Sequence, residues 1–176
     1  MNIAYTMAQG KGDTDLLLFR LAKTLASEGY QTAGTVQVNT ERAGCACDMD
    51  VMVLPAGPSL RISQDLGKAS EGCRLDPAAL ESAVGMVASR IGPQVDVLII
   101  NKFGKHEAEG RGFRTVIAEA IACDVPVLVG VNAINLEAFQ RFVGEEVTAL
   151  EPSEGALLEW VRRASAGCDQ ELDCTA

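Results

Sequence analysis

A β-branched run followed by a glycine-rich basic segment constrains the fold of this chain more than any other stretch. Val95 to Ile100 is short and is preceded by a Gly-Pro turn, which predicts a buried strand of a parallel sheet. Helical spacing returns from Phe113 to Cys123. This order of strand, loop and helix predicts an α/β fold, in which ligands bind at the loops after the carboxyl ends of strands.

The segment between this strand and helix combines four cations with three glycines in a chain whose formal net charge is −9. Such a concentration of positive charge predicts an anion site, because the planar guanidinium of Arg donates two parallel hydrogen bonds to an oxyanion. For any single cation, an ordinary solvated surface charge is the simpler interpretation. The candidate ligand-binding residues of this segment are Asn101, Lys102, Lys105, Arg111 and Arg114.

Three further polar residues of the segment allow two interpretations each. His106 is the only histidine and could act as a general base, but no nucleophile is placed beside it, so a solvated loop position is expected. Glu107 and Glu109 could bind Mg²⁺, whereas the simpler expectation is that they pair with Arg111 and Arg114. The sequence therefore assigns no catalytic residue.

Length and composition predict one α/β domain over residues 1–165, followed by a flexible tail over 166–176. With 176 residues and 48% apolar content, the chain is long enough to bury a sizeable core. We find neither a leader segment nor an apolar run near the roughly 20 residues of a membrane span, so we expect a cytoplasmic protein without a membrane partner. The 24 acidic against 15 basic residues disfavour nucleic acid as a partner.

The six cysteines are expected to be thiols rather than a disulfide framework. Cys45 and Cys47 form one pair and Cys168 and Cys174 another, but neither pair has the C-x₂-C spacing of a zinc site. We therefore predict no metal site, and the sequence leaves the role of the two pairs open.

The N-terminal segment has the order of a phosphate-binding loop. A strand over 2–7 precedes a Gly-Lys-Gly turn, and a helix follows over 16–26 with Asp13 or Thr14 as its N-cap. Backbone N–H groups and the helix dipole hold an anion in such a loop. The candidate contacts are Gly10, Lys11, Gly12 and Thr14.

The remaining elements alternate in a way that predicts a three-layer fold with a mostly parallel sheet. Two strands around Pro55 to Pro58 are expected to form a hairpin at the sheet edge, and a structured loop over 63–76 follows. Arg61 and Ser63 could complete an anion site if this loop folds over the same edge. The expected strands are 31–38, 49–54, 59–62, 125–131 and 145–150, and the expected helices are 77–91, 135–142 and 153–164.

Two departures from a working nucleotide-binding loop weaken a hydrolase interpretation. In the pattern G-x-x-x-x-G-K-[ST], alignment on Gly12 puts Asp13 in the Lys position, whereas alignment on Gly10 and Lys11 loses the hydroxyl residue. A carboxylate about 4 Å from a phosphate costs roughly 4 kcal/mol at an effective dielectric of 20. The acid that normally binds Mg²⁺ at a neighbouring strand end is replaced by Asn101-Lys102.

Several stretches together resemble a known family. G-K-G-D-T-D-L-L-L at 10–18, R-I-S-Q-D-L-G at 61–67, G-C-R-L-D at 72–76 and I-N-K-F-G-K-H-E-A-E-G-R-G-F-R at 100–114 look like an uncharacterised bacterial group. That group is similar to small P-loop nucleoside triphosphatases and is sometimes found beside molybdate-uptake genes. The resemblance implies a P-loop-like fold with a degenerate phosphate loop and a connection to molybdate or tungstate, but it supplies no established catalytic residue.

Three functions remain as hypotheses. The first is a protein that binds a small anionic ligand, either an oxyanion such as molybdate or tungstate or a phosphorylated ligand, in molybdenum or tungsten handling. The second is a nucleoside triphosphatase that uses a nucleotide with Mg²⁺ in a rearranged site. The third is an inert interaction module, and the sequence leaves self-association into a homo-oligomer open in each case.

Overall fold

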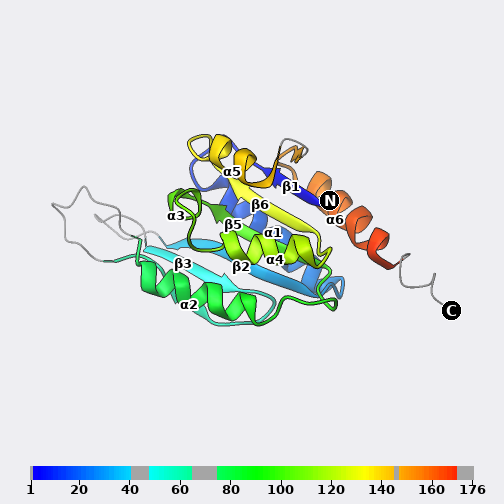
Figure 1. Ribbon diagram of the computed structural model, residues 1–176, viewed down its shortest axis with the longest axis horizontal. Helices are drawn as coiled ribbons and strands as arrows, with labels where there is room; N and C mark the ends of the chain where they lie inside the picture. The colour runs from blue at the N-terminus through cyan, green and yellow to red at the C-terminus, as the bar shows by residue number, and fades with distance from the viewer. Residues whose placement is uncertain (1, 41–47, 65–74, 145–146, 170–176) are drawn as a thin grey trace.

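The computed structural model describes residues 2–40, 48–64, 75–144 and 147–169 as a seven-stranded sheet between two layers of helices (Figure 1). The strand order is β4-β3-β2-β5-β6-β1-β7. Pairing is parallel from β2 through β7, and antiparallel between β2 and β3 and between β3 and β4. The strands are β1 Ile3–Thr6, β2 Thr32–Thr40, β3 Asp48–Val53, β4 Ser59–Arg61, β5 Val97–Phe103, β6 Val127–Val131 and β7 Thr148–Leu150.

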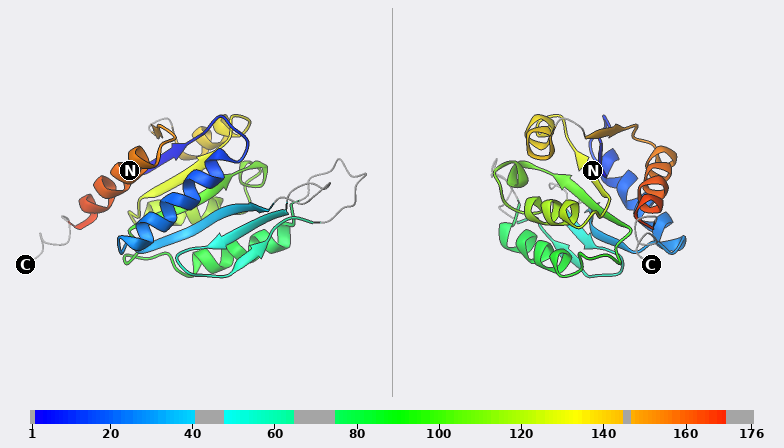
Figure 2. Two further views of the ribbon diagram at one scale, coloured as in Figure 1. Left: turned by 180° about the vertical axis from the view of Figure 1, so that it is seen from behind. Right: turned by 45° about the vertical axis from the view of Figure 1, so that its right-hand side comes forward.

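The helices divide between the two faces of the sheet. They are α1 Asp13–Ser27, α2 Pro77–Ala88, α3 Lys105–Ala108, α4 Arg114–Ala122, α5 Leu136–Val143 and α6 Glu154–Asp169. Buried residues of α2, α4 and α5 form one core cluster with the sheet, and those of α1 and α6 form a second cluster on the other face. Figure 2 shows α1 and α6 together on the rear face. The predicted three-layer, mostly parallel α/β architecture is confirmed.

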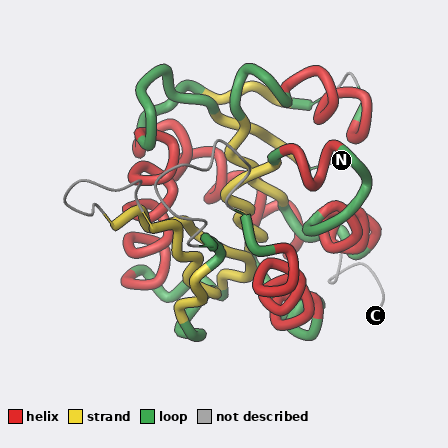
Figure 3. The backbone as a smooth tube through the Cα atoms, turned by 90° about the vertical axis from the view of Figure 1, so that its left-hand side faces the viewer, coloured by secondary structure: helices red, strands yellow, loops and turns green. Residues whose placement is uncertain are grey.

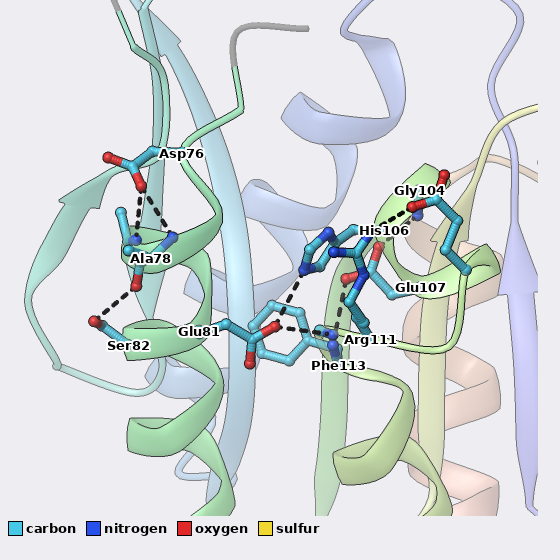
Figure 4. Close-up of polar contacts among 12 residues, drawn as sticks. Asp76, Ala78, Glu81, Ser82, Gly104, His106, Glu107, Arg111 and Phe113 are labelled. Carbon is cyan, nitrogen blue, oxygen red and sulfur yellow. Dashed lines mark hydrogen bonds and ion pairs between the residues drawn. The ribbon is translucent and has the colours of Figure 1, made fainter.

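The predicted edge hairpin is also confirmed, because β3 and β4 pair antiparallel at one end of the strand order. Asp76 caps α2, since its carboxylate accepts hydrogen bonds from the backbone N–H groups of Ala78 and Ala79 (Figure 4). The carboxylate satisfies two of the N–H groups that a helix start leaves free. Local sequence therefore defines this start well.

Some boundaries differ from the sequence-based expectation. The helix after β1 begins at Asp13, with Gly12 and neither Asp13 nor Thr14 at the cap, so that prediction was wrong. The short helix α3 was not predicted, and α6 continues to Asp169, into the segment expected to be a tail. Residues 65–74 of the loop expected over 63–76, residues 145–146 of the last expected strand and residues 170–176 of the expected tail lie outside the described residues, as do Cys45, Cys47 and Cys174.

The parallel strands bring the loops after β1, β5 and β6 to one edge of the sheet. This edge carries α3 and faces the viewer in Figure 3. Within the described ranges, none of the helices is both long and apolar enough to cross a bilayer.

Candidate functional site

The loop after β1 has the backbone geometry of a phosphate loop with one altered side chain. Gly12 adopts a positive φ of 84° at the N-cap of α1, and the Leu16 N–H donates to its carbonyl at 3.0 Å. Gly12 therefore corresponds to the last glycine of the motif, and Thr14 to the hydroxyl residue. Asp13 occupies the position of the lysine, which resolves the two alignments that the sequence left open.

The carboxylate of Asp13 folds back over this loop. A Cβ added to Gly10 would lie 2.0 Å from Oδ2 of Asp13, so only glycine leaves room for that carboxylate. Lys11 is exposed beside it. The loop thus carries a negative side chain against the backbone that normally receives phosphate.

Thr14 is buried and holds the loop in place. Its hydroxyl oxygen accepts a hydrogen bond from the backbone N–H of Ala8 at 2.9 Å, which ties the start of the loop to the first turn of α1. The hydroxyl hydrogen is still available to a further acceptor.

Asn101, at the carboxyl end of β5, carries the least satisfied polar group of this edge. Its side chain is only 2% exposed, and neither amide atom has a hydrogen-bond partner among the described residues. Asn101 Oδ1 and Thr14 Cγ2 both lie within 3.2 Å of the position that a Cβ on Gly130 would take. Each buried, unpaired polar group costs about 1–3 kcal/mol, so a site of this kind calls for a ligand, ion or water.

Lys102 and Asp15 form a charged pair next to this amide. Asp15 is buried in the first turn of α1, and its Oδ1 lies 3.6 Å from Nζ of Lys102. Its other oxygen accepts a hydrogen bond from the Asn39 amide at 2.7 Å. Three elements, α1, β2 and β5, therefore meet at this edge through side-chain contacts.

The residues at this edge do not fit a magnesium-bound nucleotide. The buried carboxylate of Asp15 contacts Lys102, the residue after Asn101, and the ammonium group of Lys102 neutralises its charge. Asp13 would repel the phosphates that the loop would have to hold. In the described ranges, no three His, Cys, Asp or Glu residues gather as a metal-binding group.

The cations of the glycine-rich segment have partners of their own. Lys105 and Arg111 both contact the carboxylate of Glu109, at 3.7 Å and 2.5 Å, and the Arg114 guanidinium lies 4.2 Å from the centre of the Phe142 ring. The hydrogen bond from Arg111 holds the pKa of Glu109 below its usual range. The expected pairing of Glu109 with Arg111 is confirmed, but among the described residues these three cations make no contact with Lys102 or Asp15.

Two acidic residues, the buried Glu107 and the exposed Glu81, accept hydrogen bonds from the same segment (Figure 4). Glu107 accepts hydrogen bonds from the backbone N–H groups of Gly104 at 2.9 Å and Phe113 at 3.3 Å. Glu81 of α2 contacts Nε2 of His106 at 3.1 Å and accepts the N–H of Gly112 at 3.2 Å. His106 is 8% exposed, so the expectation of a solvated histidine was wrong.

Glu107 accepts hydrogen bonds from backbone N–H groups and forms no ion pair with the described Arg111 or Arg114, contrary to expectation. Its spacing from Gly104 matches the reciprocal half of a capping box, in which a glutamate at the third helical position bonds the N-cap N–H. This spacing was the sequence signal that could have revealed its role.

Arg61 and Ser63 lie at the hairpin end of the sheet. Arg61 pairs with Asp48 at 3.0 Å and Asp50 at 3.1 Å, and the hydrogen bond to Asp50 raises the pKa of the guanidinium. Ser63 accepts the N–H of Met49 at 3.0 Å. Two strands, β3 and β2, separate β4 from β5, so the structure does not bring these residues together with Asn101.

Two solved structures share this fold over nearly the whole chain. The solution structure of a human cancer-related nucleoside triphosphatase has a TM-score of 0.64 and 17% identity, with 97% of this chain and 98% of that chain covered. The crystal structure of THEP1 from Aquifex aeolicus has a TM-score of 0.60 and 18% identity, with 90% and 95% covered. At these identities the likeness shows the fold alone, and it confirms the expected P-loop-like fold.

A sequence relative and a family profile extend this result. The Molybdenum import ATP-binding protein ModC 2 of Bradyrhizobium diazoefficiens is 37% identical over 165 residues, which is 93% of this chain but 18% of that protein. The chain thus spans less than a fifth of the relative's length. The profile of the family described as "Protein of unknown function (DUF2478)" matches residues 3–160, and the chain belongs to that family.

Proposed function

We propose that this chain is a small-oxyanion binding domain that uses the carboxyl edge of a degenerate P-loop-like sheet, with molybdate or tungstate as its ligand. The observation that carries the proposal is the buried amide of Asn101, which no described residue satisfies. Lys102, the next residue, supplies positive charge at the same strand end. Lys102 neutralises the nearby carboxylate of Asp15, so the donors that remain, the Asn101 amide and the Lys102 ammonium group, suit a small anion better than a metal ion.

The donor chemistry matches a tetrahedral oxyanion. The Asn101 amide can donate two hydrogen bonds and the Lys102 ammonium group three, while Thr14 keeps one hydroxyl hydrogen. The backbone of Gly10 to Gly12 and the exposed Lys11 side chain lie on the loop that precedes Thr14. In this proposal they close the site from solvent, and Lys105, Arg61, Ser63, Arg111 and Arg114 are outer residues at most.

The choice of molybdate or tungstate rests on the sequence relative. A segment 37% identical to 93% of this chain lies in a protein named for molybdenum import. That name describes the relative, whose length greatly exceeds that of this chain. For this chain, the relative's name is the reason to test molybdate and tungstate first.

Calorimetric titration tests the proposal directly. Molybdate and tungstate are expected to bind more tightly than sulfate or phosphate. Asn101→Leu, which preserves volume but removes both polar atoms, is expected to weaken binding at least tenfold, as is Lys102→Ala. Lys105→Ala is the matched control, since Lys105 is 81% exposed and pairs with Glu109. No binding heat with any of these anions, or equal losses in the Lys102 and Lys105 variants, would refute the proposal.

A nucleoside triphosphatase is the second candidate, because Thr14 stands at the hydroxyl position directly after the positive-φ Gly12 and Asp13. It predicts release of phosphate from ATP or GTP with Mg²⁺, and loss of that release in Thr14→Val. Rates equal to those in buffer would eliminate it. The oxyanion proposal predicts that outcome.

A further inference from the structure

We propose that Asp13 is a specificity-determining residue, a built-in anion that occupies the phosphate loop and keeps nucleotides and other polyphosphates out. This inference deepens the proposed function by stating which anions the same edge rejects. It rests on the geometry of the loop, and its test measures the binding of polyphosphates. The proposed function is tested with molybdate and tungstate, so one proposal can fail while the other holds.

The loop after β1 keeps a backbone geometry that favours an anion. The backbone still has the form that receives phosphate, because Gly12 takes a positive φ of 84° and α1 begins at the next residue. The positive end of a helix dipole and its free N–H groups favour an anion at this place. The Asp13 carboxylate supplies one, since it lies so close to Gly10 that a Cβ there would be 2.0 Å from Oδ2.

The two carboxylates in the first turn of α1 have different surroundings. Asp15 adds a second carboxylate to the first turn of α1, but Lys102 and Asn39 hold it in a buried contact. Asp13 is exposed, and it forms no ion pair with another described residue. Its charge therefore acts on whatever enters the loop.

The end of β5 shows that a ligand position remains beside this blocked loop. The Asn101 amide is buried and unpaired, and it lies next to Thr14, which follows Asp13 in α1. A single tetrahedral anion needs only this inner position. A polyphosphate chain needs the loop as well, where it meets the carboxylate of Asp13.

Reversing the charge at this position tests the inference. Binding of tripolyphosphate and of ATP is measured by calorimetry, without Mg²⁺, for the wild type and for Asp13→Lys and Asp13→Asn. The wild type is expected to bind neither ligand measurably, Asp13→Asn to gain some affinity, and Asp13→Lys to bind at least tenfold more tightly than Asp13→Asn. Circular dichroism and thermal melting establish that each variant is folded.

Glu119→Lys is the matched control, because it makes the same change in net charge at an exposed position of α4, on the opposite face of the sheet from α1. It is expected to leave polyphosphate binding as in the wild type. The inference is overturned if the wild type binds tripolyphosphate as tightly as folded Asp13→Lys, if both folded Asp13 variants fail to bind, or if Glu119→Lys gains as much affinity.

Discussion

Two neighbouring regions at the carboxyl edge of the sheet differ in whether their polar groups have partners. In the glycine-rich segment after β5, the cations Lys105 and Arg111 have a carboxylate partner and Glu107 satisfies two backbone N–H groups. At the end of β5 itself, the buried Asn101 amide and one oxygen of Asp15 have no hydrogen-bond partner in the described ranges. A high density of charge in the sequence therefore marks a self-contained structural segment, whereas one unremarkable asparagine marks the candidate site.

The largest expected effect tests the structural role of the glycine-rich segment. Glu107→Ala leaves two backbone N–H groups without their acceptor, and it should lower the free energy of unfolding by about 3 kcal/mol. Urea denaturation measures this loss. Glu109→Ala is the control on the same turn; because Glu109 is exposed and solvent screens its ion pairs, its loss of stability should be much smaller. Equal losses of unfolding free energy in the two variants would contradict the claim that the buried Glu107 stabilises the fold more than the exposed Glu109.

The next effect has the opposite sign and concerns the end of β5. Asn101→Leu replaces two unsatisfied buried polar atoms by apolar ones of similar volume, so it should raise the free energy of unfolding by about 1 kcal/mol while abolishing oxyanion binding. Thermal melting and titration on the same preparation measure both. If Asn101→Leu lowered the stability and left oxyanion binding unchanged, the amide would stabilise the fold and would not bind the ligand.

A smaller effect is expected at Arg114, whose guanidinium lies over the Phe142 ring. Arg114→Ala should cost about 0.5–1 kcal/mol of stability through the lost cation–π contact. Oxyanion affinity should change less than twofold. A double-mutant cycle with Phe142→Leu isolates the contact, and a large fall in oxyanion affinity in Arg114→Ala would instead place this arginine at the ligand.

The smallest effect is a pH dependence at Glu109. The hydrogen bond from Arg111 lowers the pKa of Glu109 in the folded protein, so its contribution to stability is present above the unfolded pKa and is lost as pH falls through the folded one. The stability difference between the wild type and Glu109→Gln should therefore shrink on acidification below about pH 4.3. A difference that grows towards acid would contradict this sign.

The sequence predicted the layers and most elements of the fold, because each buried strand and amphipathic helix carries its own periodicity. It missed α3, which spans only Lys105–Ala108 and is too short for a periodic signal. The alignment of the phosphate loop could not be decided either, because it depends on where α1 begins. In the structure Gly12 fixes that start.

The candidate site was predicted only in part. The sequence predicts Asn101 and Lys102 as site residues, but it points equally to the cations from Lys105 to Arg114, whose partners Glu109 and Phe142 depend on the folded arrangement. Whether Asn101 is satisfied depends on β6, where Gly130 packs against it. Hydrogen-bond satisfaction is a property of tertiary neighbours, so the local pattern of residues could not reveal it.

The most direct test of this account is to locate tungstate by its anomalous scattering in a crystal grown without sulfate or phosphate. We predict one strong peak within hydrogen-bonding distance of Nδ2 of Asn101 and Nζ of Lys102. A peak held instead by Arg111, Arg114 and Lys105, with the Asn101 amide left unpaired, would contradict the account.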